Sequence, residues 1–257
     1  MCREQMDEIF AQTLTGDYDD ESPWEAIRTL RGIASREVFD CAVEWCTSDN
    51  PLKRARGADV LAQLGRTFEH PSNSFPEECF SAVSALVQRE KEPVPLNSAS
   101  SALGHIGNPQ AIPLVVEHRF HPNADVRFGV AFALGNFAND SRAADALVTL
   151  MQDADDDVRD WATFGLGVQG DRDSEEIRDA LFQRLTDPHR DVREEALAGL
   201  AKRKDQRALP TLISALSQPE ISDCVLEAAE SFLGETKQGI KSSSSDYIAA
   251  LKTRFSM

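Results

Sequence analysis

Hydrophobic residues recur along this chain in a pattern that repeats from one segment to the next. Three segments align without gaps, and each carries a valine, an arginine directly after it and a leucine eight positions after the valine: NADVRFGVAFALG (123–135), DDDVRDWATFGLG (155–167) and HRDVREEALAGLA (189–201). This spacing places the apolar residues on one face of an α-helix. The sequence therefore predicts one amphipathic helix that occurs several times.

The same register extends beyond these three segments. Positions equivalent to the valine, which we call reference positions, fall at 53, 95, 126, 158, 192 and 225, and the residue eight positions later is always leucine: Leu61, Leu103, Leu134, Leu166, Leu200 and Leu233. The last four intervals are 31, 32, 34 and 33 residues, whereas the first is 42. We interpret the surplus, in TFEHPSNSFPEE (67–78), as an inserted or lengthened loop.

A second helix is predicted between successive copies of the first. Apolar triads there follow the i, i+3, i+4 spacing of one helical face; they are Ile112/Val115/Val116, Ala144/Leu147/Val148, Ile177/Ala180/Leu181 and Leu209/Leu212/Ile213. Because one helical pair cannot bury its apolar stripe alone, neighbouring pairs must stack. We therefore expect an all-α fold, a right-handed α-α superhelix of about six to seven helical pairs.

The whole chain, 1–257, is predicted to form a single solenoid. Residues 51–235 hold the central repeats, and 1–50 hold N-terminal capping helices in which SPWEAIRTLRGIASREVFDCAVEWC forms a degenerate helical pair. A polar KSSSSD run (241–246) precedes a C-terminal capping helix within 240–257, where Tyr247, Ile248 and Leu251 would close the core. Caps are expected because the end repeats lack a neighbour on one side.

The net charge of the chain limits the classes of partner that it can bind. Lys plus Arg number 27 and Asp plus Glu number 43, giving a net charge of −16. Such a field repels nucleic-acid phosphates and anionic membranes, and no signal sequence or membrane-length apolar run is present in the sequence. We expect a cytoplasmic protein that binds a protein partner, not nucleic acid or membrane. The five cysteines are an odd set without a CxxC pair, which indicates reduced packing residues.

The DxxVRxxAxxALG pattern resembles the HEAT-repeat family, and specifically its phycobilisome-lyase-like subclass, over residues 50–235. VRDWATFGLG, EIRDAL and REEALAGLAKRKDQRALPTL resemble bacterial HEAT-repeat immunity proteins of Rhs polymorphic-toxin loci. That resemblance implies a protein that binds and neutralises a cognate toxin. An acidic immunity protein would suit a basic, nuclease-type toxin.

The helix that carries the reference positions generally lines the concave surface of HEAT solenoids, so its polar face predicts a binding surface. At about 100° per residue, positions two, three, six and ten after the reference face away from the core. The predicted partner-binding residues are Phe128, Phe132, Asn136, Asp160, Trp161, Phe164, Glu194 and Glu195. Four solvent-facing aromatics would form a patch that a partner covers, with the acids steering it. The alternative is that these rings pack in the core.

Two recurring polar features favour structural roles. Arg127, Arg159 and Arg193 lie beside Asp125, Asp157 and Asp191, which predicts a ladder of inter-repeat ion pairs and helix caps. Asp153, Asp155, Asp156 and Asp157 cluster without EF-hand spacing, so we interpret them as a solvated turn and expect no metal site.

No enzymatic motif emerges, and we expect a chain that is not an enzyme and needs no cofactor. Deoxyhypusine hydroxylase has similar repeats with paired His-Glu iron ligands, but His105 stands alone and His118 with His121 lacks partnering carboxylates. HEAT-like DNA glycosylases need a basic channel, and here the channel positions are acidic.

The predicted function is a non-catalytic protein-binding scaffold, an immunity protein that holds a toxin on its concave face. The alternative is a general assembly scaffold or a phycobilin-lyase-like chaperone, since aromatic rings could hold a tetrapyrrole.

Overall fold

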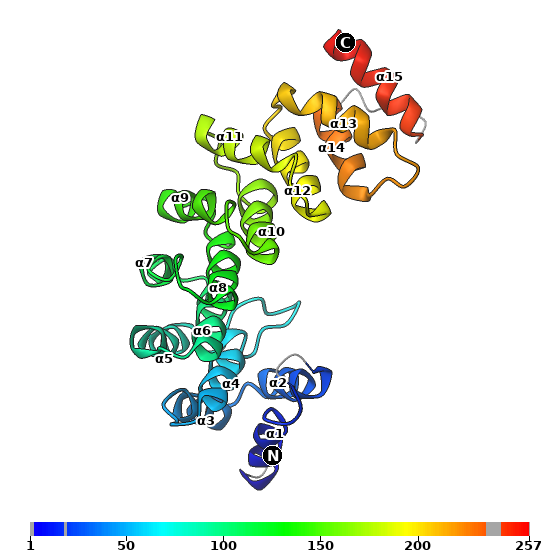
Figure 1. Cartoon of the computed structure of the whole chain (residues 1–257). Helices are drawn as coiled ribbons and strands as arrows, with labels where there is room; N and C mark the ends of the chain where they lie inside the picture. Colours follow the sequence, from blue (N-terminus) through cyan, green and yellow to red (C-terminus); the bar gives the residue numbers. More distant parts are fainter. Residues whose placement is uncertain (1–2, 18–19, 235–242, 257) are drawn as a thin grey trace. The chain divides into compact units, whose positions relative to one another are not determined.

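A computed structural model describes residues 3–17, 20–234 and 243–256 of the chain (Figure 1). Every regular element within these ranges is helical, and the helices fall into two compact units, Met1–Phe137 and Ala138–Met257. The all-α solenoid class is confirmed within them, while the single solenoid over 1–257 stays a prediction. No helix in the described ranges has both the length and the apolarity to cross a membrane.

The first unit consists of helical pairs in two layers. Helices α4, α6 and α8 pack side by side as one layer, and α3, α5 and α7 form the other. Helix α2 packs on α1 and α4 and covers the N-terminal side. The bounds are α1 (Arg3–Gln12), α2 (Glu21–Ile33), α3 (Arg36–Cys46), α4 (Pro51–Ala62), α5 (Pro76–Arg89), α6 (Pro93–Ile106), α7 (Ala111–Val116) and α8 (Ala124–Gly135).

The second unit repeats this arrangement. Helices α10, α12 and α14 form a layer that we call the inner row, as α4, α6 and α8 do in the first unit, and α9 packs on α10 and α11. The bounds are α9 (Ser141–Leu150), α10 (Asp156–Phe164), α11 (Glu175–Arg184), α12 (Arg190–Lys202), α13 (Leu209–Leu216), α14 (Asp223–Leu233) and α15 (Ser244–Phe255), with a π-helical turn at Gly165–Gln169 and a 3-10 turn at Gln206–Ala208.

The recurring leucines hold the inner rows together. All six leucines at eight positions after a reference position are buried, with at most 1% of their surface exposed; they are Leu61, Leu103, Leu134, Leu166, Leu200 and Leu233. Burying a leucine side chain stabilises a fold by roughly 1.5–3 kcal/mol, so these residues are a main source of cohesion. The predicted repeat and its core face are confirmed.

The predicted loop at 67–78 is irregular up to residue 75, but its last three residues, 76–78, already belong to α5, which packs against α6. Only the segment between α4 and α5 is irregular, and it is ordered by polar contacts: the Asn73 amide donates to the Leu61 carbonyl at 2.8 Å, and the Ser74 N–H donates to the Leu64 carbonyl at 2.8 Å. Phe68 in this loop is fully exposed.

Helix caps lie three residues before the reference position. Asn50, Asn123, Asp155 and Ser222 occupy this place, and each side chain accepts a hydrogen bond from a backbone N–H of the first helical turn. The prediction had placed caps at Asp125, Asp157 and Asp191, and this was wrong. Those residues lie inside the first turns of α8, α10 and α12, two positions after the N-cap, where a carboxylate is stabilised by the helix dipole.

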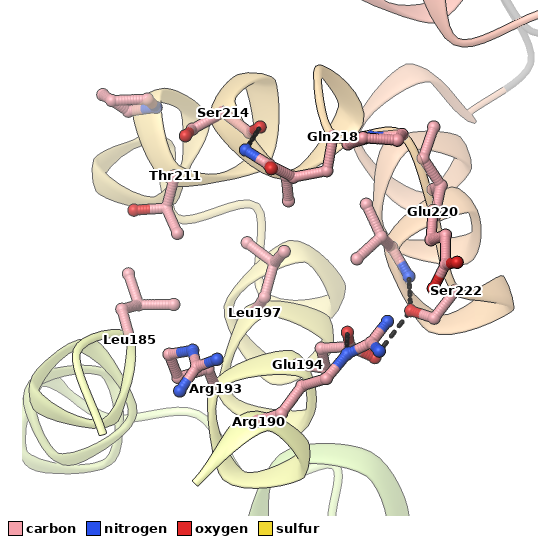
Figure 2. Close-up of a pocket in the computed structure, with 15 residues that line it drawn as sticks. Leu185, Arg190, Arg193, Glu194, Leu197, Thr211, Ser214, Gln218, Glu220 and Ser222 are labelled. Atoms are coloured by element: carbon pink, nitrogen blue, oxygen red, sulfur yellow. Dashed lines mark hydrogen bonds and ion pairs between the residues drawn. The ribbon is translucent and has the colours of Figure 1, made fainter. Parts of the chain in front are cut away.

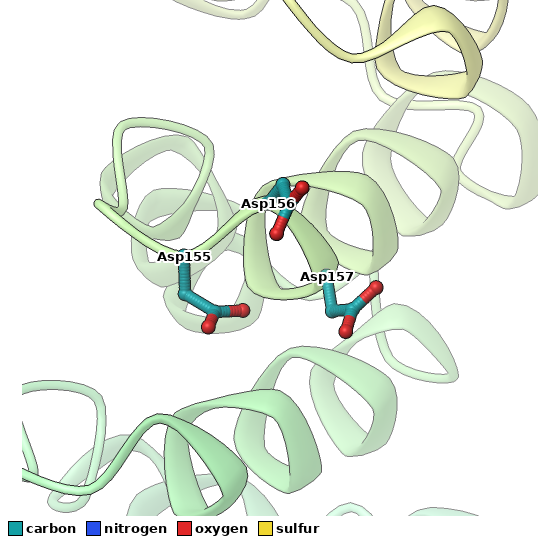
Figure 3. Close-up of side chains that lie close together, drawn as sticks. All are labelled: Asp155, Asp156 and Asp157. Carbon is teal, nitrogen blue, oxygen red and sulfur yellow. The ribbon is translucent and has the colours of Figure 1, made fainter.

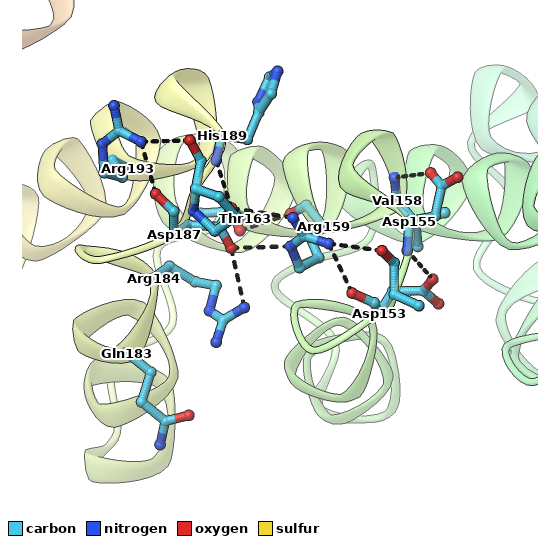
Figure 4. Close-up of polar contacts among 12 residues, drawn as sticks. Asp153, Asp155, Val158, Arg159, Thr163, Gln183, Arg184, Asp187, His189 and Arg193 are labelled. Atoms are coloured by element: carbon cyan, nitrogen blue, oxygen red, sulfur yellow. Dashed lines mark hydrogen bonds and ion pairs between the residues drawn. The ribbon is translucent and has the colours of Figure 1, made fainter.

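The recurring arginines bind carbonyls in the preceding turn. Arg127 Nη1 donates to His121 and Pro122, Arg159 Nη1 to Asp153 and Ala154, and Arg193 Nη1 to Asp187 and Pro188, at 2.7–3.2 Å. Arg159 also reaches the next repeat, where its Nε and Nη2 grip both carboxylate oxygens of Asp187 at 2.9 and 3.1 Å (Figure 4). The predicted inter-repeat ion pair exists at Arg159, with Asp187 and not Asp157 as its partner.

A π-helical turn extends α10 and is stabilised by a buried arginine. Insertion of one residue per turn leaves carbonyls without their usual donors. Arg203, from the end of α12, donates to the carbonyls of Leu166, Gly167 and Gly170 at 2.8–3.2 Å. One guanidinium therefore satisfies the backbone groups that the π-turn releases.

The C-terminal helix α15 closes the second unit as predicted. Tyr247 and Leu251 are buried and Ile248 is half-buried, and the Tyr247 hydroxyl donates to Glu230 Oε1 at 2.9 Å. Residues 241–242 of the predicted KSSSSD break lie outside the described residues.

The π-helical turn that extends α10 approaches α12 so closely that glycine is required at their crossing. A Cβ added to Gly199 would lie 2.7 Å from Gly167 Cα, a backbone atom that cannot rotate away. We expect Gly199→Ala to lower the free energy of unfolding by about 1–2 kcal/mol, because forced separation of packed helices outweighs the gain in helix propensity. Urea denaturation measures this difference.

Gly32→Ala is the matched control. Gly32 is exposed in α2 and nothing lies within 4 Å of its added Cβ, so this variant should be more stable than wild type by up to ~1 kcal/mol. Equal stabilisation by both substitutions would show that the crossing of the π-turn and α12 tolerates a methyl group.

Candidate partner-binding site

In the first unit, the predicted binding residues Phe128 and Phe132 lie on α8, and Asn136 directly follows this helix. Asn136 is exposed, but Phe128 and Phe132 are half-buried and not fully solvent-facing as predicted. The Phe132 ring packs edge-on against His105 of α6, with ring centroids 4.9 Å apart. Gly129, expected on the same surface, is buried because its Cα faces the Asn97 backbone of α6. Close packing within the inner row therefore covers part of the predicted face.

A polar chain that the sequence did not predict crosses this face. Arg31 Nη1 donates to Gln63 Oε1 at 3.1 Å, and Gln63 Nε2 lies 2.9 Å from His105 Nδ1. Since the Gln63 oxygen already accepts from Arg31, its amide donates to the imidazole. Burial and the nearby Arg31 and Arg66 charges lower the pKa of His105 to about 4, so the ring is neutral at neutral pH. The sequence did not reveal a partner for His105, because Gln63 lies 42 positions away along the chain.

In the second unit, Trp161 and Phe164 lie side by side on α10. Both are half-buried, and their rings meet edge to face with centroids 5.7 Å apart. The spacing of three residues places them on one strip of the helix surface. A half-buried aromatic pair of this kind is held in position by the fold and still offers ring surface to a partner.

Glu194 is held on the surface of α12 by two polar contacts. Its Oε1 accepts from Arg190 Nε at 2.7 Å, and its Oε2 accepts from the Ser222 hydroxyl at 2.6 Å. Ser222 is the N-cap residue of α14, so Glu194 links two inner helices. Its carboxylate is thus already partly neutralised.

Asp160 of α10 and Glu195 of α12 form a carboxyl pair. Asp160 Oδ1 and Glu195 Oε2 are both buried, and neither receives a hydrogen bond from an N–H or hydroxyl donor in the described residues. Burial, followed by the charges of Asp160 and Asp191, raises the pKa of Glu195 to about 9. The protonated Glu195 carboxyl then donates a hydrogen bond to the Asp160 carboxylate. Near neutral pH Glu195 is therefore protonated, and the pair carries less negative charge than two free carboxylates.

The acidic turn before α10 has a structural role. Asp155, Asp156 and Asp157 place carboxylate oxygens within 4.8 Å of one another (Figure 3). Asp155 caps α10 by accepting from the Val158 N–H at 3.2 Å, and Asp153 Oδ1 accepts from the Asp155 N–H at 2.9 Å. Asp156 and Asp157 are exposed, as the interpretation of a solvated turn requires.

Comparison with known proteins agrees with this architecture. The family profile described as HEAT repeats matches residues 81–167, 149–234 and 178–253. These matches cover more than half of the chain. The chain belongs to the HEAT-repeat family.

Individual relatives are similar over most of their length. Protein YibA of Escherichia coli strain K12 is 29% identical over 229 residues, which are 87% of this chain and 79% of YibA. The X-ray structure of YibA superposes with a TM-score of 0.71 at 25% identity, over 97% of this chain and 93% of that one. An engineered protein gives a TM-score of 0.56 at 20% identity over 98% and 78%. The CpcE–CpcF phycocyanin lyase of Nostoc sp. PCC7120 gives 0.46 at 19% identity over 89% and 81%.

The protonated Glu195 carboxyl in this HEAT-repeat protein makes stability depend on pH. The pKa of Glu195 is about 9 in the folded state and near 4.5 in an unfolded chain, so the folded state binds more protons between these values and stability falls as pH rises through them. We expect Glu195→Gln, which keeps the shape and a donor for Asp160, to be more stable than wild type at pH 8 by about 1–2 kcal/mol, a figure reduced for solvent screening of a half-buried group.

Urea denaturation between pH 5 and pH 8.5 measures this effect. The charged groups around the pair are Asp157 on α10, His189 and Asp191 at the start of α12, and Cys224 on α14. Glu175→Gln, at an exposed position in the first turn of α11, is the control and should keep the wild-type pH profile. A Glu195→Gln profile parallel to that of wild type would show that Glu195 is ionised in the folded protein.

Proposed function

We propose that this chain is a non-catalytic protein-binding module whose inner helices capture one partner, and that it acts as a bacterial immunity protein that neutralises a cognate toxin. The observation that carries the proposal is the Trp161–Phe164 pair on α10, ring surface held in a fixed geometry beside Asp160. Side chains of this type supply most of the binding energy in protein interfaces. The HEAT-repeat fold supports a binding role because its repeats present long rows of helices.

Electrostatics support a basic partner. The chain carries a net charge of −16, and this long-range field accelerates encounter with a positively charged protein. Asp160 with Glu195, and Glu194 with Arg190, are partly neutralised pairs, so the attraction comes from the field of the whole surface more than from these three carboxylates. A basic nuclease-type toxin fits this field.

Resemblance of VRDWATFGLG and REEALAGLAKRKDQRALPTL to immunity proteins of Rhs toxin loci supports the specific role. An immunity protein must hold one partner tightly for as long as the toxin is present. Rigid aromatic anchors favour such slow dissociation, because they lose little side-chain entropy on binding.

Affinity capture from the native lysate tests the partner surface. Wild type should retain one stoichiometric protein, and Trp161→Ala/Phe164→Ala should bind it about 30-fold more weakly, which corresponds to about 2 kcal/mol. Phe182→Ala is the matched control, because Phe182 is an exposed aromatic on α11, outside the inner row. Thermal denaturation checks that both variants are folded.

Co-expression tests the immunity role. The captured protein should arrest growth when expressed alone, and wild type should restore growth while Trp161→Ala/Phe164→Ala should not. A captured protein that is harmless would contradict the immunity role and favour an assembly scaffold. A coloured ligand in place of a protein would favour the lyase-like chaperone.

A further inference from the structure

A cavity opens in the C-terminal unit, between α12, α13 and the start of α14 (Figure 2). Its volume is about 750 Å³, which is within the range of small-ligand and peptide sites. Helices α12 and α13 both contact the 3-10 turn and α14, but they do not pack along each other. The sides of α12 and α13 that face each other therefore remain open. Leu185 and Leu197 form an apolar wall, and Arg190 and Arg193 lie at one side.

Arg193 has donor groups that the fold does not use. Its Nη1 binds the carbonyls of Asp187 and Pro188, but no partner among the described residues accepts from its Nε or Nη2. In the preceding repeat the equivalent atoms of Arg159, Nε and Nη2, donate hydrogen bonds to the carboxylate of Asp187. Asp187 lies five residues before reference position 192, and the equivalent residue before position 225 is Glu220.

Glu220 does not complete this pair. It is exposed on the α14 side of the cavity, whereas Arg193 lies on the far side next to Leu185 (Figure 2). The inter-repeat ion pair that Arg159 makes with Asp187 is therefore not repeated between Arg193 and Glu220, and Arg193 lines the cavity instead. An arginine fork with two parallel donors is matched to a carboxylate in geometry and charge.

We propose that this cavity binds an extended acidic segment of a partner protein, with one carboxylate on Arg193 in the manner of Asp187 on Arg159. Lining residues on α13 run from Pro210 to Ala215, a length of about 7.5 Å at 1.5 Å per residue. About two residues of extended chain at 3.3 Å each fill this length, and the cavity continues past the end of the helix along Gln218, Pro219 and Glu220.

The walls of the cavity suit alternating acidic and apolar side chains. Leu185, Leu197 and Val225 accept an apolar side chain, and Thr211 and Ser214 offer hydroxyl groups to the backbone of the segment. In an extended segment successive side chains point to opposite sides, so an acidic residue can meet Arg193 while its neighbour packs on the leucines. This site does not depend on the proposed toxin-binding role.

Fluorescence polarisation with a labelled peptide tests the proposal on the full chain. The probes are fluorescein-labelled Leu-Glu-Leu-Glu amide and its Leu-Gln-Leu-Gln counterpart. We expect the acidic peptide to bind wild type about tenfold more tightly than the neutral one, because a charge-assisted bidentate pair is lost with glutamine. Glu220→Gln should tighten binding of the acidic peptide, since it removes a like charge from the cavity.

Two variants should weaken binding. Arg193→Gln should abolish the difference between the two peptides, and Ser214→Glu, at an exposed position on α13, should weaken the acidic peptide at least fivefold while leaving every side-chain hydrogen bond in place. Arg178→Gln is the matched control. It also removes one arginine charge, but from an ion pair with Asp173 outside the cavity, and it should leave the affinities for both peptides unchanged.

Three outcomes of the binding measurements themselves would overturn the proposal, and a fourth comes from competition. They are equal affinities for the two peptides, the absence of saturable binding by the acidic peptide, and an Arg193→Gln effect no larger than that of Arg178→Gln. Displacement of the acidic peptide by glutarate at equal concentration would also overturn it, because the site would then belong to a free dicarboxylate.

Discussion

The structure depends on one constraint: the apolar stripe of each helical pair can leave water only against the next pair. Six leucines at equivalent positions meet this constraint, and all of them are buried in the inner rows. Burial at every repeat requires neighbouring helices to approach closely. At the crossing of the π-turn and α12 the approach is so close that two glycines face each other, and Arg203 binds the carbonyls that the π-turn leaves free. Side chains on the inner rows are therefore positioned by packing before any partner is present.

The recurring arginine combines a structural role with a chemical one. In three repeats its Nη1 binds two carbonyls of the preceding turn, which fixes the plane of the guanidinium. At Arg159 the other two donors, Nε and Nη2, bind the carboxylate of Asp187 in the following repeat, whereas Arg193 lines a cavity. The same arginine position therefore serves packing in one repeat, at Arg159, and is available to bind a partner in the next, at Arg193.

Close packing also changes the charges on the inner face. Asp160 and Glu195 belong to neighbouring helices, and their burial against each other favours a protonated Glu195 over two negative charges. His105 is neutral for a related reason, since burial and two nearby arginines disfavour its protonation. A surface that is acidic by composition consequently contains groups whose charge differs from that of the free amino acids. The long-range field of the chain still favours a basic partner.

The sequence by itself determined the repeat, because helix periodicity and the recurring leucines are local patterns that burial preserves. It also determined the C-terminal closing helix and the inter-repeat role of Arg159. Only the tertiary structure decided how far Phe128, Phe132, Trp161 and Phe164 are exposed, since that depends on the spacing between helices. The pairing of Gln63 with His105, the pairing of Asp160 with Glu195, and the open cavity beside Arg193 join residues about 30 to 40 positions apart. Such contacts follow from the rotation and separation of neighbouring helical pairs, which no local pattern encodes.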